Sequence, residues 1–383
     1  MKKFFLLAVL FFPIACLCAQ TKTTITGNVK HPEGVRMTYS VNEKSYPIEI
    51  DKDGKFRIEL DLKDFAIVNL APFSGVPDIV TDAKGSHIPV PSMAVYVEPG
   101  ENVTVDFDTK EWPIARISGQ KTAKDWGYLY ELQGALTRMT YENERLRIGY
   151  GIERPTPEES EQMDKKKAVL KQQYDDRLKA YCESHPDSYI TLVQIRNRVR
   201  DDAVEDLEKD FRKLSSRMQA SAAGKELEHA ILAKKNSRVG VIAPDFTGMT
   251  PDGKTIKLSD YRGKYVLLDF WGSWCHACRY SHPHLLELFK KYHSCGLEFV
   301  NVASEYQKEL AEKKKTWVKA IQEDGIEDFT HVLDTDENRI VESYSIQFFP
   351  TKILISPTGE IIARWDGTAE TLDSTLEKIF QGK

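Results

Sequence analysis

The feature that most constrains the fold is a strand–loop–helix pattern around two closely spaced cysteines. Residues 265–270 form a short apolar run typical of a buried strand, and a loop containing Gly272 and Ser273 follows. A helical pattern then extends over 276–292. Cys275 is therefore predicted at a helix N-terminus, where unpaired backbone N–H groups and the helix dipole favour its thiolate. Cys278 follows one helical turn later, within disulfide reach.

This arrangement indicates an attacking thiol and a resolving thiol. We expect Cys275 to be exposed and thiolate-favoured, and to form a mixed disulfide from which Cys278 releases the partner. A purely structural disulfide is an alternative, but it would close a very short loop and gain little stability.

A zinc site is a second alternative for the cysteine pair. It would need two more ligands, and the sequence has no second C-x-x-C. The nearby candidates are Cys295, His282, His284 and His293. The apolar face of the predicted helix is instead defined by Leu285, Leu288, Phe289 and Tyr292.

The first 19 residues are expected to be a secretory signal peptide. Met1-Lys2-Lys3 is basic, residues 4–14 are apolar except for Pro13, and cleavage is expected after Ala19. A lipoprotein acylated at Cys16 and an N-terminal membrane anchor that is never removed are the alternatives. The mature protein is accordingly expected in the periplasm or cell envelope, either secreted or anchored at Cys16.

Composition and patterning predict several domains. The 383 residues are 41% hydrophobic and 29% charged, which excludes a disordered chain, and a net charge of −5 argues against nucleic acid as a partner. We expect a β-sandwich-like N-terminal domain over 20–118, a central α-helical region over 119–237 and an α/β domain over 238–383. The spacing of Leu170, Tyr174, Leu178 and Tyr181 predicts a helix that ends at His185-Pro186.

Individual elements follow from the same patterns. Residues 24–29, 56–60, 95–97 and 103–107 alternate as half-buried strands do. In the α/β region we expect strands over 265–270, 297–302, 331–333, 352–355 and 361–364. Helices are expected there over 276–292, 309–322, 337–344 and 369–380.

The run Asp269-Phe270-Trp271-Gly272-Ser273-Trp274-Cys275-His276-Ala277-Cys278 resembles the active-site strand and loop of thioredoxin. Pro283 matches the helix-kinking proline of that fold, and Phe349-Pro350-Thr351 matches its cis-proline loop. Residues 240–246 and 258–264 resemble the lead-in of the TlpA/ResA-like branch, which is related to the AhpC/TSA proteins. The resemblance covers residues 240–380 and implies a C-terminal α/β thioredoxin fold. The front half resembles the uncharacterised N-terminal region of such proteins in Bacteroides-like bacteria.

The resemblance also implies roles for individual residues. Cys275 would be the attacking thiolate, Cys278 the resolving thiol, and Asp269 the buried acid that assists proton transfer at Cys278. A partly exposed, structural Asp269 is the alternative. Pro350 is expected to be cis. The residues expected to bind substrate are Trp274, His276, Phe349 and Pro350. No cofactor and no metal are implied.

Two departures from the family pattern concern this site. His276-Ala277 replaces the usual Gly-Pro or x-Pro pair, and a protonated His276 would favour the Cys275 thiolate and raise the reduction potential. Phe348-Phe349 makes the docking groove more apolar or narrower.

The leading hypothesis is an exported thiol–disulfide oxidoreductase that reduces protein disulfides. Its expected partners are disulfide-bearing envelope proteins and a membrane thiol donor such as a DsbD/CcdA-like protein. The alternatives are a thiol peroxidase of the AhpC/TSA type and a non-enzymatic envelope binding protein that uses residues 22–236. Cys182 is expected to be a buried, inert thiol and Cys295 a free or buried one, with a second redox thiol at Cys295 as the alternative.

Overall fold

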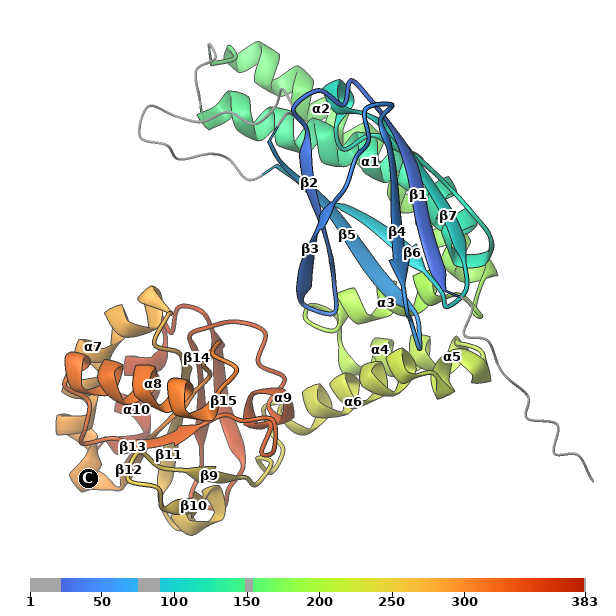
Figure 1. Ribbon diagram of the computed structural model, residues 1–383. Helices are drawn as coiled ribbons and strands as arrows, with labels where there is room; N and C mark the ends of the chain where they lie inside the picture. Colours follow the sequence, from blue (N-terminus) through green and yellow to red (C-terminus); the bar gives the residue numbers. More distant parts are fainter. Residues whose placement is uncertain (1–21, 75–89, 149–153, 382–383) are drawn as a thin grey trace, which may run out of the picture. The chain divides into compact units, whose positions relative to one another are not determined.

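The computed structural model describes residues 22–74, 90–148 and 154–381 (Figure 1). The predicted signal peptide, including Cys16, lies outside these residues. The chain divides into two compact units, 1–191 and 192–383, which are considered separately below. The helical region expected over 119–237 contributes helices to both units. Within the described ranges, no helix combines the length and the apolar character needed to cross a membrane.

Two four-stranded sheets dominate the first unit (Figure 1). One has the order β4-β1-β7-β8, comprising β4 (Lys55–Leu60), β1 (Thr23–Lys30), β7 (Asn102–Asp108) and β8 (Ala115–Ser118). The other has the order β3-β2-β5-β6, comprising β3 (Lys44–Ile48), β2 (Arg36–Val41), β5 (Ala66–Ser74) and β6 (Met93–Val97). The strands expected over 24–29, 56–60, 95–97 and 103–107 are confirmed as β1, β4, β6 and β7.

Two long helices follow the sheets: α1 (Lys121–Ile148) and α2 (Pro157–Ser184). Trp126 of α1 stacks on Tyr96 of β6 with ring centroids 4.0 Å apart, and its indole N–H donates to the Ala94 carbonyl at 2.7 Å. This contact fixes α1 against one sheet. Helix α2 begins with a reciprocal cap between Thr156 and Glu159 and ends before His185, as predicted.

The second unit begins with short helices and continues into an α/β domain. Helix α3 (Tyr189–Arg198) crosses the boundary between the units, and α4 (Val204–Lys213), α5 (Ser216–Ala220) and α6 (Ala222–Asn236) follow. The α/β domain contains a seven-stranded sheet with the order β10-β9-β13-β12-β11-β14-β15. Its strands are β9 (Thr247–Met249), β10 (Thr255–Lys257), β11 (Tyr265–Trp271), β12 (Leu297–Ala303), β13 (Thr330–Leu333), β14 (Thr351–Ile355) and β15 (Ile361–Asp366).

Helices cover both faces of this sheet. They are α7 (His276–Tyr292), α8 (Leu310–Asp324), α9 (Ile340–Ser343) and α10 (Leu372–Phe380). One buried cluster joins Leu267 and Trp271 of β11 to α7, α8 and α10, and the other joins Leu268 and Phe270 to α9. Because side chains alternate along a strand, Asp269 points to the same face as Leu267 and Trp271. Asp269 therefore faces α7.

The expected elements of the α/β region are all present. Helix α7 has the predicted bounds, whereas α9 and α10 begin three residues later than expected. The β9–β10 hairpin was not predicted, because each of its strands has only three residues.

Candidate active site

The cysteine pair lies where the central strand of the sheet gives way to α7. Cys275 is the N-cap of α7, and a disulfide joins it to Cys278. The Cys278 backbone N–H donates to Cys275 Sγ at 3.2 Å. A helix N-terminus with an N–H directed at sulfur favours negative charge on that sulfur after reduction. The predicted positions of both cysteines on the helix are confirmed.

The expectation that Cys275 is exposed is wrong for the disulfide form. Cys275 is 6% exposed and Cys278 is fully buried. Both belong to the apolar cluster beneath α7, α8 and α10, and Phe349 packs against this cluster. The sequence placed Cys275 at a helix end but gave no information on what packs around it.

The loop before Cys275 is held by contacts to the chain that follows β12. Gly272 leaves room for this approach, because a Cβ there would lie 2.5 Å from Trp274 Nε1 and 2.6 Å from the Ser304 carbonyl oxygen. The Trp274 indole N–H donates to that carbonyl at 2.9 Å. Glu305, which is buried, accepts from the Ser273 backbone N–H at 2.8 Å and from its hydroxyl at 2.5 Å.

Glu305 was missed by the sequence analysis, although a signal existed. It lies just beyond the carboxyl end of β12, which runs parallel to β11. The carboxyl ends of adjacent parallel strands lie at one edge of the sheet, which is where the cysteine loop begins.

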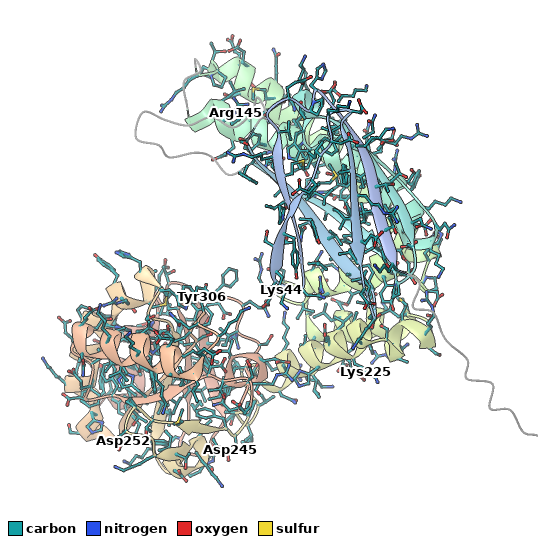
Figure 2. The ribbon with its side chains drawn as sticks, viewed as in Figure 1. Lys44, Arg145, Lys225, Asp245, Asp252 and Tyr306 are labelled. Atoms are coloured by element: carbon teal, nitrogen blue, oxygen red, sulfur yellow. A yellow bond between two sulfur atoms is a disulfide. The ribbon has the colours of Figure 1, made fainter. Side chains whose placement is uncertain are left out.

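The proline loop packs beside the cysteine loop. The Phe349–Pro350 peptide bond is cis, as expected. The Phe349 ring meets Trp274 edge-on at 5.3 Å, and Trp274 stacks on Tyr306 at 4.2 Å. Tyr306, which Figure 2 labels, is 72% exposed, whereas Trp274 is 39% exposed. Trp274, Tyr306 and Phe349 therefore form an aromatic surface beside the disulfide, and the exposed Phe348 precedes Phe349 in the proline loop.

The loop between α3 and α4 reaches Phe348 of the proline loop. The Arg200 guanidinium lies over the Phe348 ring, 5.0 Å from its centroid. Lys234 of α6 holds the loop by donating to the carbonyls of Val199, Arg200 and Asp202, each at 2.7 Å. Nothing in the sequence pointed to this contact, because more than a hundred residues separate Arg200 from the proline loop.

Of the remaining candidates, His276 is exposed in the first turn of α7. Cys182 and Cys295 are half-buried and lie outside the disulfide.

A row of polar side chains crosses the sheet beneath α7. Asp269 is 1% exposed, so the alternative of a partly exposed residue is excluded. It pairs in register with Lys352 of β14 and Asn301 of β12, and Asn301 pairs with His331 of β13. Directly paired residues share a face, so Lys352, Asp269, Asn301 and His331 form one continuous buried row.

Charge and hydrogen bonding connect this row. Lys352 Nζ lies 3.0 Å from Asp269 Oδ1, and Asn301 Nδ2 donates to Asp269 Oδ2 at 3.2 Å. Burial lowers the pKa of His331 to about 4, although its Nε2–H donates to the Ile326 carbonyl. His331 is therefore neutral at neutral pH.

Arg279 and Asp324 form an ion pair next to the row. Arg279 Nε and Nη2 donate to Asp324 Oδ1 at 3.0 and 2.6 Å. These bonds raise the pKa of Arg279 above its ordinary value. The same Asp324 carboxylate accepts from His282 Nδ1 at 2.7 Å. Helix α8 is thereby tied to the first two turns of α7.

The α/β domain is similar in sequence to known thiol–disulfide oxidoreductases. The AhpC/TSA family model matches residues 239–364. The thiol–disulfide oxidoreductase ResA of Bacillus subtilis (strain 168) is 34% identical over 148 residues, which are 38% of this chain and 78% of ResA. The ResA of Bacillus cereus (strain ZK / E33L) is 32% identical over 173 residues, or 44% of this chain and 95% of that protein.

A solved structure, the thioredoxin domain of a thiol–disulfide oxidoreductase from Bacteroides vulgatus, is 33% identical, with a TM-score of 0.34, and covers 37% of this chain and 98% of that domain. The curated relatives are matched over more than two thirds of their own length, and the matched cysteine loop carries the disulfide described above. The chain belongs to the family of ResA-like thiol–disulfide oxidoreductases.

Proposed function

We propose that this thiol–disulfide oxidoreductase is exported and reduces disulfide bonds in cell-envelope proteins. The observation that carries the proposal is the Cys278 N–H directed at Cys275 Sγ at the start of α7. The neighbouring aromatic side chains, of which Trp274 is 39% and Tyr306 72% exposed, supply an apolar surface for a segment of a partner protein.

The cycle begins with the reduced pair. The Cys275 thiolate attacks a substrate disulfide, a mixed disulfide forms, and one substrate thiolate leaves. Cys278 then loses its proton and attacks Cys275 Sγ, which reforms the enzyme disulfide and releases the second substrate thiolate. A membrane thiol donor of the DsbD/CcdA-like kind would supply the two electrons that return the pair to the dithiol.

Asp269 is the proposed acceptor of the Cys278 proton. Lys352 Nζ lies 3.4 Å from Ser281 Oγ, and Ser281 donates to the Cys278 carbonyl at 2.7 Å. The Asp269–Lys352 pair is thus tied to the helical turn that begins at Cys278. The Asp269→Asn variant keeps the shape of the side chain and removes the base, so it should slow the attack by Cys278.

The decisive experiment is to trap the partner. The Cys278→Ser variant still attacks but cannot resolve, so passing envelope extracts over it should leave partners that dithiothreitol releases. The Cys275→Ser variant should lose insulin-type disulfide reduction and capture nothing, and Cys295→Ser is the matched control that should behave as wild type. If Cys278→Ser captures no more than Cys275→Ser while the wild type consumes peroxide, the thiol peroxidase hypothesis replaces this one.

The location and organisation of the chain are part of the proposal. The basic start and apolar run of residues 1–14 support export, with removal of 1–19 or acylation at Cys16. For the first unit we infer that the two sheets pack as a sandwich. The burial of alternate residues along β4, β5 and β7 supports this, because each sheet then buries one face. N-terminal sequencing and lipid analysis of the mature protein would test the first point.

A further inference from the structure

His282 lies beside Asp269, the proposed proton acceptor, but the cycle described above gives it no role. It is fully buried on α7, four residues after Cys278, so both side chains lie on the same face of the helix. A buried histidine is uncommon among the apolar residues of such a face, and here Leu285 and Leu288 continue the face beyond it.

The His282 ring lies between two carboxylates. Its Nδ1 is 2.7 Å from Asp324 Oδ2, and its Nε2 is 4.0 Å from Asp269 Oδ2. Because a carboxylate only accepts, the short contact assigns a proton to Nδ1, and the Nε2 of the neutral ring is then the atom that can accept a proton on the side of Asp269. The Trp271 ring meets His282 edge-on, with centroids 4.8 Å apart, and limits its rotation.

His282 and two members of the polar row each have a buried polar atom without a hydrogen-bond partner in the described residues. His282 Nε2, Asn301 Oδ1 and His331 Nδ1 form no hydrogen bond within the described residues. Buried polar atoms are almost always satisfied in native proteins, so the unsatisfied His282 Nε2, which lies 4.0 Å from Asp269 Oδ2, marks an acceptor available to a proton from that carboxyl group. The 4.0 Å between Asp269 Oδ2 and Nε2 would close to a hydrogen bond through one bridging water or a side-chain movement of about 1 Å.

The other end of the path reaches the surface. Asp324 is 11% exposed at its side chain, and its ion-pair partner Arg279 is 31% exposed. A proton that arrives at Asp324 can therefore leave to solvent, whereas Asp269 is 1% exposed and has no such exit of its own.

We propose that His282 relays the Cys278 proton from Asp269 to Asp324 during resolution of the mixed disulfide. The inference rests on the proposed function. Cys278 gives its proton to the Asp269 carboxylate, His282 Nε2 accepts that proton, and Nδ1 gives its own to Asp324, from which it passes to water. The Cys278 thiolate then forms the bond to Cys275 Sγ, and the substrate thiolate leaves. The two electrons come from the Cys275–Cys278 pair, so no further oxidant is required.

The titratable and charged groups around His282 contact either the ring itself or its two carboxylate neighbours. Asp324 of α8 and Asp269 of β11 flank the ring directly. Arg279 of α7 contacts Asp324, Lys352 of β14 and Asn301 of β12 contact Asp269, and His331 of β13 interacts electrostatically with His282. The pKa of His331 is lowered by burial, so His331 adds no positive charge near the ring at neutral pH. Lys352 and Arg279 each pair with one of the two carboxylates.

The test is the rate of resolution in a single turnover. The oxidised full-length chain is first reduced, then mixed with a disulfide peptide, and release of the second thiol is followed between about pH 6 and about pH 9. We expect His282→Gln to slow release about ten- to a hundredfold at pH 6. The deficit should shrink towards pH 9, because Cys278 then loses its proton directly. Alkylation of Cys275, which reports the first step, should stay at the wild-type rate.

Matched variants separate the possible outcomes. His284→Gln changes an exposed histidine on the same helix and should leave the whole profile unchanged. Asp324→Asn, at a partly exposed site, should reproduce the pH-dependent deficit and serves if His282→Gln does not fold. A deficit in His282→Gln and Asp324→Asn that is equal at every pH would indicate packing alone and overturn the relay. If Asp269→Asn releases the second thiol slowly while His282→Gln and Asp324→Asn release it normally, the relay is overturned but Asp269 remains the acceptor of the Cys278 proton. If Asp269→Asn itself releases the thiol normally, Asp269 is not that acceptor.

Discussion

Lys352 and Asp269 face each other across the β11–β14 pair, with 3.0 Å between ammonium nitrogen and carboxylate oxygen. Neither side chain is more than 4% exposed, and Leu267 and Trp271, which flank Asp269 on the same face of β11, belong to an apolar cluster. Removing two charges from water costs free energy that the attraction between them roughly offsets. The pair therefore adds little net stability, but each charge becomes costly when the other is lost.

The Lys352→Met variant should lower the free energy of unfolding by about 3–5 kcal/mol, because it leaves the Asp269 carboxylate buried without a counter-ion. Urea denaturation measures this. Lys264→Met is the matched control, since Lys264 pairs with Glu298 at 2.6 Å but is 55% exposed, and it should cost no more than about 1 kcal/mol. Equal losses in the two variants would contradict the assignment. The double variant Asp269→Leu/Lys352→Met should recover most of the loss.

The Glu305→Ala variant should destabilise the protein by about 1.5–3 kcal/mol and reduce turnover. It removes the charged acceptor of the Ser273 backbone N–H and hydroxyl, and of the Thr316 hydroxyl at 3.2 Å. Ser273→Ala is a graded control that removes one of these bonds and should cost about 1 kcal/mol. Thermal unfolding and insulin reduction measure the two effects. A loss in Ser273→Ala as large as that in Glu305→Ala would show that the carboxylate does not hold the loop.

Stability should fall on acidification through His331. Burial lowers the pKa of His331 to about 4 from its ordinary value of 6.5. Between these values the unfolded chain binds more protons than the folded protein, so stability present above pH 6.5 is lost as pH falls towards 4. The full loss is about 3 kcal/mol. Urea denaturation at several pH values should show a shallower slope over this range for His331→Gln. An unchanged slope would mean that His331 does not titrate differently on unfolding.

The Arg200→Ala variant should weaken binding of protein substrates without changing the chemistry. The guanidinium covers the Phe348 ring beside the cis-proline loop, and an exposed contact of this kind is worth about 0.5–1 kcal/mol. We expect KM for a protein disulfide to rise about two- to fivefold, with kcat and the rate towards a small aromatic disulfide unchanged. Arg212→Ala, in α4, is the control for loss of a surface charge. A fall in kcat without a rise in KM would mean that Arg200 does not contribute to the binding of protein substrates.

Much of the α/β domain could be predicted because its signals are local. The strand before Cys275, the helix after it and the cis proline each depend on a short run of sequence. The partners of Asp269 could not be found in this way. Lys352 and Asn301 reach it only through the register of β14 and β12, which no local pattern determines.

His282 illustrates a signal that was present but interpreted too narrowly. The sequence grouped it with nearby histidines as a possible zinc ligand, although its spacing to Cys278 and Leu285 places it on the buried face of α7. In the first unit, strands β2, β3, β5 and β8 were missed. Their identification depends on pairing with strands far along the chain, as β5 pairs with both β2 and β6.

The low solvent exposure of Cys275 has a consequence for how fast thiols in the surroundings can reduce the disulfide. Cys275 is 6% exposed in the disulfide form, and Phe349 packs against the cluster that contains it, so the disulfide offers little surface to a thiol in solution. We expect freely diffusing small thiols to reduce this disulfide slowly, whatever the thermodynamic driving force. The redox state of the cysteine pair would then exchange only slowly with small thiols and disulfides in its surroundings. One dedicated thiol donor could therefore keep the pair reduced in a compartment that is oxidising overall.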